Sequence, residues 1–171
     1  MGPRALLREW AERHDVRGEG RRAVVVGCGL GADAEYLARL GFETTGFDVA
    51  ATAVRLAAER HPGSTVDYRV ADLLDLPAAW RHAFDLVVEI FTVQALPDPP
   101  RDRAIAGVAD LVAPGGTLLA VAFRHVAGVD PAAGPPFSLT RASMERLAAD
   151  GLEVVRAEEL DGPLWRVEYH R

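Results

Sequence analysis

A short apolar run that leads directly into three glycines on alternate positions constrains the fold of this chain more than any other feature. Residues 23–26 read Ala-Val-Val-Val, and Gly27-Cys28-Gly29-Leu30-Gly31 follows at once. This pattern is typical of a buried strand that turns sharply into a helix, because glycine tolerates left-handed backbone and leaves room for a ligand. The helix after the turn would direct its N-terminal N–H groups at that ligand.

A second part of the predicted site is a carboxylate at the end of the next predicted strand. Asp48 follows the segment 43–47, and a carboxylate at that position can accept hydrogen bonds from both hydroxyls of a ribose. Together the two features predict a binding unit for an adenosine-containing cofactor. The spacing Gly27-x-Gly29-x-x-Ala32 also satisfies the dinucleotide pattern, so this unit alone does not choose between cofactor classes.

Length and composition narrow the class of protein. The 171 residues suffice for one domain with a full core, so we expect a single domain over residues 1–171 that opens with a short helical segment at 1–20. No apolar run approaches the length of a membrane span, and the charged N-terminal segment lacks the apolar region of a secretory signal. With a single cysteine as well, we expect a cytoplasmic protein without a membrane partner, either a monomer or a homodimer.

The charged residues exclude several kinds of chemistry. All 19 basic side chains are arginine, which excludes a P-loop nucleotide hydrolase, a pyridoxal enzyme and a dehydrogenase that uses a Tyr/Lys pair. One cysteine excludes a cysteine-ligated iron–sulfur cluster or four-cysteine zinc site, and the histidines never pair at ligand spacing on one helix, so we expect no metal. A net charge of −6 argues against a nucleic-acid partner.

Strands and helices alternate along the chain with short connections, a pattern typical of a parallel α/β sheet. The predicted strands are residues 23–26, 43–47, 66–70, 84–90, 117–123, 152–160 and 164–170. The predicted helices are residues 4–14, 32–40, 50–60, 101–112 and 141–150, the last with Thr140 as its N-cap. Asp161-Gly162-Pro163 predicts a hairpin between the last two strands. We therefore expect a doubly wound, mostly parallel seven-stranded, Rossmann-like sheet with a C-terminal antiparallel hairpin.

Five segments in this order resemble the class I S-adenosylmethionine-dependent methyltransferases, and the resemblance covers nearly the whole chain. They are residues 26–31, Asp48, and residues 71–73, 84–89 and 111–116. The resemblance implies S-adenosylmethionine as cofactor and S-adenosylhomocysteine as product. It places the glycine turn under the methionine part, Asp48 on the ribose, Asp72 on the adenine amino group, and Val49 and Leu73 beside the adenine ring. The implied cofactor-binding set is Gly27, Cys28, Gly29, Leu30, Gly31, Asp48, Val49, Ala71, Asp72, Leu73 and Glu89.

A narrower resemblance, to the thiopurine, thiol and halide methyltransferase group, lies near the C-terminus. Residues 134–139, 144–147 and 165–170 carry it, whereas residues 90–96 differ from the usual Tyr-Asp-Arg run of that group. It implies a small-molecule acceptor, with sulfur, nitrogen or halide preferred.

The acceptor is expected at the carboxyl ends of the fourth and fifth strands, where open α/β sheets bind ligands. Glu89 and His125 are the candidate catalytic residues: Glu89 would hold the amino group of the cofactor or orient the acceptor, and His125 would be a general base. Phe91, Arg124 and Phe137 are the candidate substrate-binding residues, with Arg124 suited to an anionic acceptor.

Plainer interpretations of these residues stay open. Asp72 is also suited to capping a turn, His125 to a solvated loop, and the two phenylalanines to core packing. Cys28 is interpreted as a small filler of the glycine turn and not as a nucleophile.

Two alternative functions also remain. One is an NAD-dependent oxidoreductase built on the same turn, although no hydride-transfer constellation is visible. The other is a non-catalytic S-adenosylmethionine-binding module, which would bind the cofactor tightly without turnover.

Overall fold

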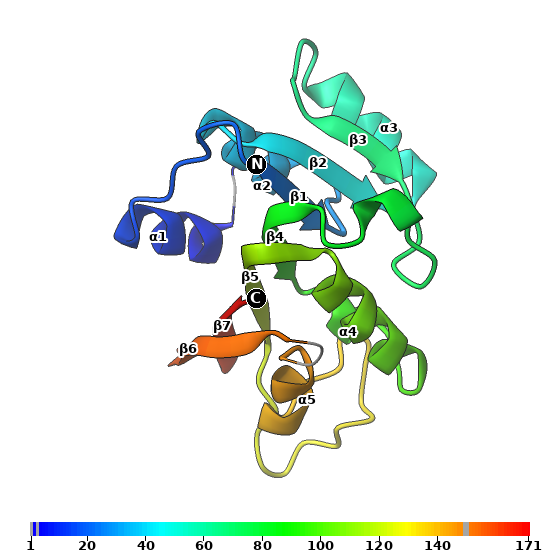
Figure 1. Cartoon of the computed structure of the whole chain (residues 1–171). Coiled ribbons are helices and arrows are strands. Elements are labelled where there is room, and N and C mark those ends of the chain that lie inside the picture. The colour runs from blue at the N-terminus through cyan, green and yellow to red at the C-terminus, as the bar shows by residue number, and fades with distance from the viewer. Residues whose placement is uncertain (1, 3, 149–150) are drawn as a thin grey trace.

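Seven strands form one sheet in the order β3-β2-β1-β4-β5-β7-β6, as the computed structural model shows for the residues it describes, which are 2, 4–148 and 151–171 (Figure 1). The strands are β1 (Arg22–Val26), β2 (Glu43–Asp48), β3 (Asp67–Val70), β4 (Phe84–Ile90), β5 (Val112–Phe123), β6 (Glu153–Leu160) and β7 (Leu164–His170). The first five are mutually parallel, and β7 lies antiparallel between β5 and β6. This confirms the predicted doubly wound sheet and its C-terminal hairpin.

Helices cover both faces of the sheet. They are α1 (Ala5–Arg13), α2 (Ala32–Arg39), α3 (Ala51–Arg60), α4 (Pro100–Asp110) and α5 (Arg141–Arg146), with short 3-10 turns η1 (Ala78–Trp80) and η2 (Val93–Ala95). Figure 1 shows α1 on one side of the sheet and α4 and α5 on the other. The parallel strands β1 to β5 all end at the same edge of the sheet, and the glycine turn, which follows β1, lies at that edge.

The alternation of side chains along β1 explains the two hydrophobic layers. Ala23 and Val25 point into the layer that holds α1 and α2, whereas Val24 and Val26 point into the layer that holds α4 and α5. All four are at most 2% exposed, because helices cover both faces of a parallel sheet. The strand can therefore be apolar throughout, as its sequence is.

Two predicted boundaries differ from the structure by more than two residues. β5 begins at Val112 and not at residue 117, because Val112 already pairs with Phe84 before an irregularity at the Pro-Gly-Gly segment shifts the register. Gly115 there has a φ of 76°. Helix α5 ends at Arg146, although its predicted N-cap is confirmed by the bond from the Ser143 N–H to Thr140 Oγ1 at 3.2 Å. Residues 149–150 of that prediction lie outside the described residues.

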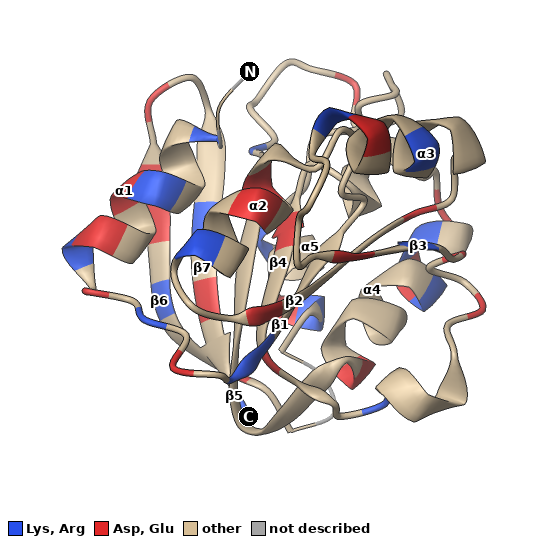
Figure 2. Ribbon diagram, turned by 90° about the horizontal axis from the view of Figure 1, so that it is seen from above, with Lys and Arg blue, Asp and Glu red and all other residues tan. Residues whose placement is uncertain are grey.

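Basic and acidic residues are interspersed on α1, α2 and α3 (Figure 2). The first turn of α2 carries Asp33 and Glu35, which suits the positive end of a helix dipole. Within the described residues, no helix combines the length and the apolar character needed to span a membrane.

Candidate functional site

A cleft with a cavity volume of about 380 Å³ lies at the carboxyl ends of β1, β2 and β4. Its lining comes from the glycine turn, the residues after β2 and β3, and the segment that leads from β4 into η2: Arg4, Val26, Gly27, Phe47, Asp48, Val49, Ala71, Asp72, Leu73, Leu74, Ile90, Phe91, Thr92, Ala95 and Leu96. Its volume falls within the range of about 300–1,000 Å³ that is usual for small-molecule sites.

Three other hollows have similar volumes but different surroundings. One, of about 370 Å³, is lined by Cys28, Gly29 and Leu30 of the glycine turn, which do not line the first cleft, together with Arg60 and His61. A groove of about 390 Å³ runs beside α4 between Leu73 and Leu111. Another, of about 410 Å³, is lined by the end of α1 and by Asp85, at the beginning of β4. We choose the first cleft because ligands of open α/β sheets bind outside the carboxyl ends of the strands.

The glycine turn has a backbone that only glycine fits. Gly27 has a φ of 62°, and a Cβ there would lie 2.5 Å from the Oγ1 of Thr92. Gly31 has a φ of 88°, and its Cβ would lie 2.2 Å from the hydroxyl of Tyr68. A side chain at either position would therefore strain the backbone and collide with a neighbour, at Gly27 with Thr92 in the wall of the cleft and at Gly31 with Tyr68, which does not line the cleft.

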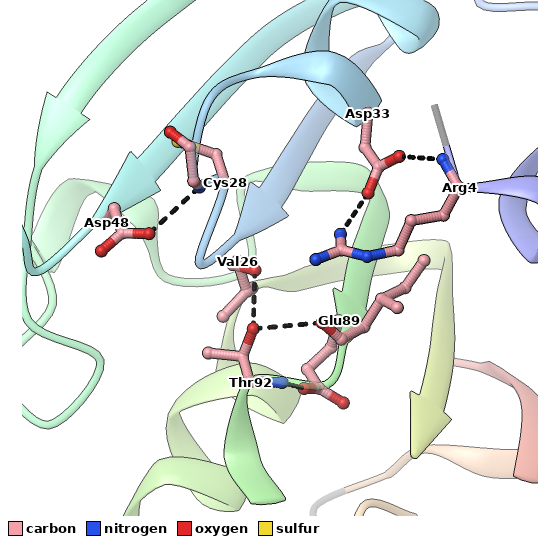
Figure 3. A network of polar contacts seen from close by, with 9 residues as sticks. Arg4, Val26, Cys28, Asp33, Asp48, Glu89 and Thr92 are labelled. Atoms are coloured by element: carbon pink, nitrogen blue, oxygen red, sulfur yellow. Dashed lines mark hydrogen bonds and ion pairs between the residues drawn. The ribbon is translucent and has the colours of Figure 1, made fainter. Parts of the chain in front are cut away.

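Asp48 ties the turn to the next helix. Its Oδ2 accepts a hydrogen bond from the Gly29 N–H at 3.1 Å (Figure 3). Its Oδ1 accepts one from the Ala50 N–H at 2.9 Å. The carboxylate also lines the cleft, so its remaining lone pairs can face a ligand.

The next part of the cleft is apolar with one carboxylate. Val49 is 69% exposed and Leu73 is 9% exposed, and both line the cleft. Asp72 lines it too, while its Oδ1 accepts a hydrogen bond from the Leu74 N–H at 2.9 Å. Its side chain therefore closes a turn, and its predicted contact with the adenine amino group stays a prediction.

Cys28 lies on the inner side of the turn. Its side chain packs beside Gly46, where a Cβ would meet the Cys28 sulfur at 3.3 Å. Burial, followed by the negative charge of Asp48, raises the pKa of the thiol to about 12. The thiol stays protonated at neutral pH, which agrees with a filler and not with a nucleophile.

Sequence reasoning missed Arg4, which lines the cleft from the segment before α1. Its backbone N–H donates to Asp33 Oδ1 at 2.7 Å, and its guanidinium pairs with Asp33 Oδ2 (Figure 3). The guanidinium carbon also lies 5.9 Å from the ring centroid of Phe91. An isolated arginine before a helix belongs to no motif, so no sequence signal pointed to it.

Glu89 lies behind the wall of the cleft. The side chain is fully buried, and Oε1 accepts hydrogen bonds from the N–H groups of Thr92 at 2.7 Å and Val93 at 2.9 Å. Burial raises its pKa to about 7, against the lowering effect of these two bonds and of the Arg4 charge. Oε2 has no hydrogen-bond partner among the described residues. Glu89 is absent from the lining, so its predicted contact with cofactor or acceptor stays a prediction.

The predicted acceptor residues separate into two groups. Phe91 lines the cleft, with a φ of 62° and its ring stacked on Phe123 at a centroid distance of 5.0 Å. Arg124, His125 and Phe137 do not line it. The predicted roles of these three residues therefore remain predictions.

Other contacts occupy these three side chains. Arg124 faces the hairpin, 3.6 Å from Glu159 and with its guanidinium 6.0 Å from the Trp165 ring. His125 Nδ1 lies 3.2 Å from the Ser138 hydroxyl. The ring of Phe137 packs under the guanidinium of Arg101 at 5.1 Å.

A methyltransferase domain family matches residues 23–116, which include the glycine turn and all of β4. A ubiquinone biosynthesis O-methyltransferase of Xanthomonas axonopodis pv. citri (strain 306) is 39% identical over 101 residues, which cover 58% of this chain and 41% of that protein. A protein with the same description from Xanthomonas campestris pv. campestris (strain B100) is 40% identical over the same shares. The chain thus matches less than half of the length of these curated relatives.

Solved structures share the fold. An S-adenosylmethionine-dependent methyltransferase from Mesorhizobium loti superposes with a TM-score of 0.75 at 19% identity, covering 96% of this chain and 98% of that chain. An N-methyltransferase from Bradyrhizobium japonicum WM9, in complex with S-adenosylhomocysteine, gives a TM-score of 0.73 at 24% identity, covering 97% and 83%.

Proposed function

The chain belongs to the methyltransferase domain family, within the class I S-adenosylmethionine-dependent methyltransferases, and we propose that it transfers the methyl group of S-adenosylmethionine to a small molecule. The observation that carries the proposal is the cleft lined by Gly27 of the glycine turn, where no side chain fills the space, and by Asp48 at the end of the neighbouring strand. The family match supports it, because the matched segment contains both features.

The lining of the cleft fits the cofactor. Asp48 would accept hydrogen bonds from the ribose hydroxyls, and Val49 and Leu73 would enclose the adenine ring, with Asp72 at its amino group. Gly27 would allow the methionine part to lie against the backbone, where a side chain would exclude it. Arg4 would supply a positive charge for the cofactor carboxylate.

Bound there, the cofactor would supply a methyl group activated on a sulfonium. An acceptor lone pair would attack the methyl carbon, and the electron pair of the broken S–C bond would stay on sulfur in the neutral thioether that leaves. The residues of the chain therefore have to hold two reactants in line. Correct positioning alone can supply about 7–11 kcal/mol of such a barrier. Phe91 and Thr92, at the β4 end of the cleft, would form the wall against which the acceptor is positioned.

The charged groups of the cleft favour acceptors that need little help from a base. The carboxylates in its lining are Asp48 and Asp72, both assigned to the adenosine half. A thiol, with a pKa of about 8.5, is partly ionised near neutral pH, whereas an alcohol would require strong deprotonation. We therefore propose a sulfur, nitrogen or halide acceptor. The curated relatives are described as O-methyltransferases, so an oxygen acceptor is the alternative to be tested beside it.

Calorimetric titration tests the cofactor. S-adenosylmethionine and S-adenosylhomocysteine are expected to bind the wild type with micromolar affinity and to bind Asp48→Ala at least tenfold more weakly. Asp85→Ala is the matched control, because Asp85 also accepts a backbone N–H bond, from Arg22 at 2.9 Å, but does not line the cleft. Binding of NAD and of neither adenosyl compound would overturn the proposal in favour of an oxidoreductase.

A panel of acceptors then separates an enzyme from a binding module. Thiols, amines, halide ions and phenols are supplied with S-adenosylmethionine, and formation of S-adenosylhomocysteine is followed. Turnover with thiols, amines or halide would support the acceptor assignment, and turnover with phenols alone would contradict it. Tight binding without turnover on any class would favour a non-catalytic module.

A further inference from the structure

Glu89 places a buried carboxyl group directly behind the floor of the proposed cofactor cleft. Its backbone pairs in register with Val26, the residue before the glycine turn. Its Oε1 is bonded to the N–H of Thr92, and Thr92 itself lines the cleft and would touch any side chain at Gly27 (Figure 3). One residue, Thr92, thus connects this carboxyl group to the position assigned to the methionine part.

The hydrogen bonds of this carboxyl group are unequal. Oε1 accepts two backbone N–H bonds, whereas Oε2 has no partner among the described residues. A carboxylate oxygen without a donor or cation nearby is costly to bury, so the neutral acid is favoured. Burial therefore keeps Glu89 protonated, and a cation bound nearby would favour its ionised form.

Few charges act on Glu89 from the elements packed around it. The flanking strands present Val26 and Ala120 in register with it, and both are apolar. Arg4 acts from the segment before α1 and lowers the pKa of Glu89. Tyr169 of β7 is buried, and its own pKa is raised by burial first and by the charges of Glu89 and Glu145 next, so the phenol stays neutral. The net surroundings bring the pKa of Glu89 to about 7.

We propose that Glu89 makes the cleft selective for the positively charged cofactor over its neutral product, by ionising when a cation occupies the cleft. The inference rests on the proposed function, because the methyl donor carries a sulfonium and the product a neutral thioether. Glu89 does not line the cleft, so in this inference it acts as a specificity-determining residue and not as a catalytic one.

The sign of the pH dependence follows from linkage. Below pH 7 Glu89 is mostly neutral in the free protein, and a bound cation must first drive off its proton. Above pH 7 the carboxylate is already present and attracts the sulfonium without that step. Affinity for the charged cofactor therefore rises with pH through 7, while affinity for the neutral product lacks this contribution.

The experiment measures dissociation constants for S-adenosylmethionine and S-adenosylhomocysteine at pH 6 and pH 8. If the cation lowers the pKa of Glu89 by one unit, the preference for S-adenosylmethionine grows about fivefold between these values in the wild type. In Glu89→Gln the side chain at position 89 cannot ionise. Any change with pH in the preference of this variant for S-adenosylmethionine comes from the ligands' own amino groups and is subtracted from the change in the wild type. Glu59→Gln, at an exposed glutamate of α3, is the matched control and should behave as the wild type.

The outcomes separate this inference from the proposed function. If both ligands bind and the preference changes equally with pH in wild type and Glu89→Gln, this inference alone is overturned. If neither ligand binds at either pH, the proposed function is overturned with it. Should Glu89→Gln fail to fold, the wild-type titration still decides, because a preference that does not grow with pH contradicts the inference.

Discussion

The two halves of the cleft are built in different ways. The half at the ends of β1 and β2 consists of a backbone turn, the carboxylate of Asp48 at a strand end and a pair of apolar walls, and a hydrogen bond from Gly29 to Asp48 joins the turn to the strand end. The half at the end of β4, assigned to the cofactor carboxylate and the acceptor, is formed by side chains from two separate segments: Arg4 from the segment before α1, and Phe91 and Thr92 from the segment after β4. The first half is a local motif, and the second exists only when the whole chain is folded.

The largest effect is expected from a substitution in the glycine turn, in the half of the cleft that is a local motif. Gly27→Ala forces alanine into a left-handed conformation, which costs about 1–2 kcal/mol by itself, and brings its Cβ against Thr92. We expect the affinity for S-adenosylmethionine to fall about 100-fold, equivalent to about 3 kcal/mol, in a calorimetric titration.

Gly29→Ala is the control for that result. Gly29 has a φ of 53°, but a Cβ there would meet nothing within 4 Å. It should lose stability to a similar extent and retain most of the affinity. Equal loss of binding in the two variants would show that backbone strain, and not the filled cleft, is responsible.

The next largest effect is expected on the free energy of unfolding and concerns Glu89, which lies behind the β4 end of the cleft. The pKa of Glu89 is about 7 in the folded protein and close to 4.5 when unfolded, so its burial destabilises the fold increasingly as pH rises from 4.5 to 7. We expect Glu89→Gln to gain about 3 kcal/mol of unfolding free energy relative to the wild type between pH 4 and pH 8, measured by urea denaturation. A difference independent of pH would show that Glu89 has an ordinary pKa.

A smaller effect tests whether Arg4 belongs to the cofactor site. Arg4→Gln removes the charge assigned to the cofactor carboxylate, and its guanidinium is partly exposed to solvent. We expect the affinity for S-adenosylhomocysteine to fall about fivefold to tenfold, an effect that shrinks with added salt. Arg8→Gln, which removes an exposed partner of Glu12 on the same helix, should leave the affinity unchanged.

The smallest effect is expected at His125, outside the cleft. Because its ring lies against Ser138 and does not line the cleft, His125→Ala should change turnover less than twofold once an acceptor is known. A loss of about 100-fold or more, together with loss of the acidic limb of the pH–rate profile, would restore its predicted role as general base.

The sequence predicted the local half because its signals are local. Glycines at left-handed positions, a carboxylate at a strand end and a continuous apolar strand each reflect the chemistry of a few consecutive residues. The doubly wound sheet and the C-terminal hairpin followed from the same patterns, and the structure confirms both. The extension of β5 back to Val112 was missed, because its Pro-Gly-Gly segment has the composition of a turn although the strand continues through it.

The second half was harder to predict for a physical reason. Arg4 reaches the cleft through its contacts with Asp33, far along the chain, and no pattern near Arg4 indicates them. Arg124 and His125 follow the predicted strand as expected, but the hairpin and the loop before α5 determine where their side chains point. Long-range contacts of this kind depend on packing and have no short sequence signature.

The position of β7 has a consequence for the order in which the sheet can be completed. β7 is the last strand along the chain, yet it lies inside the sheet, between β5 and β6. During synthesis β6 emerges first and has no place to pair, while β5 presents an unpaired edge to other chains. The segment with the cofactor motif can therefore assemble early, but the protein stays prone to edge-to-edge association until Leu164–His170 have left the ribosome.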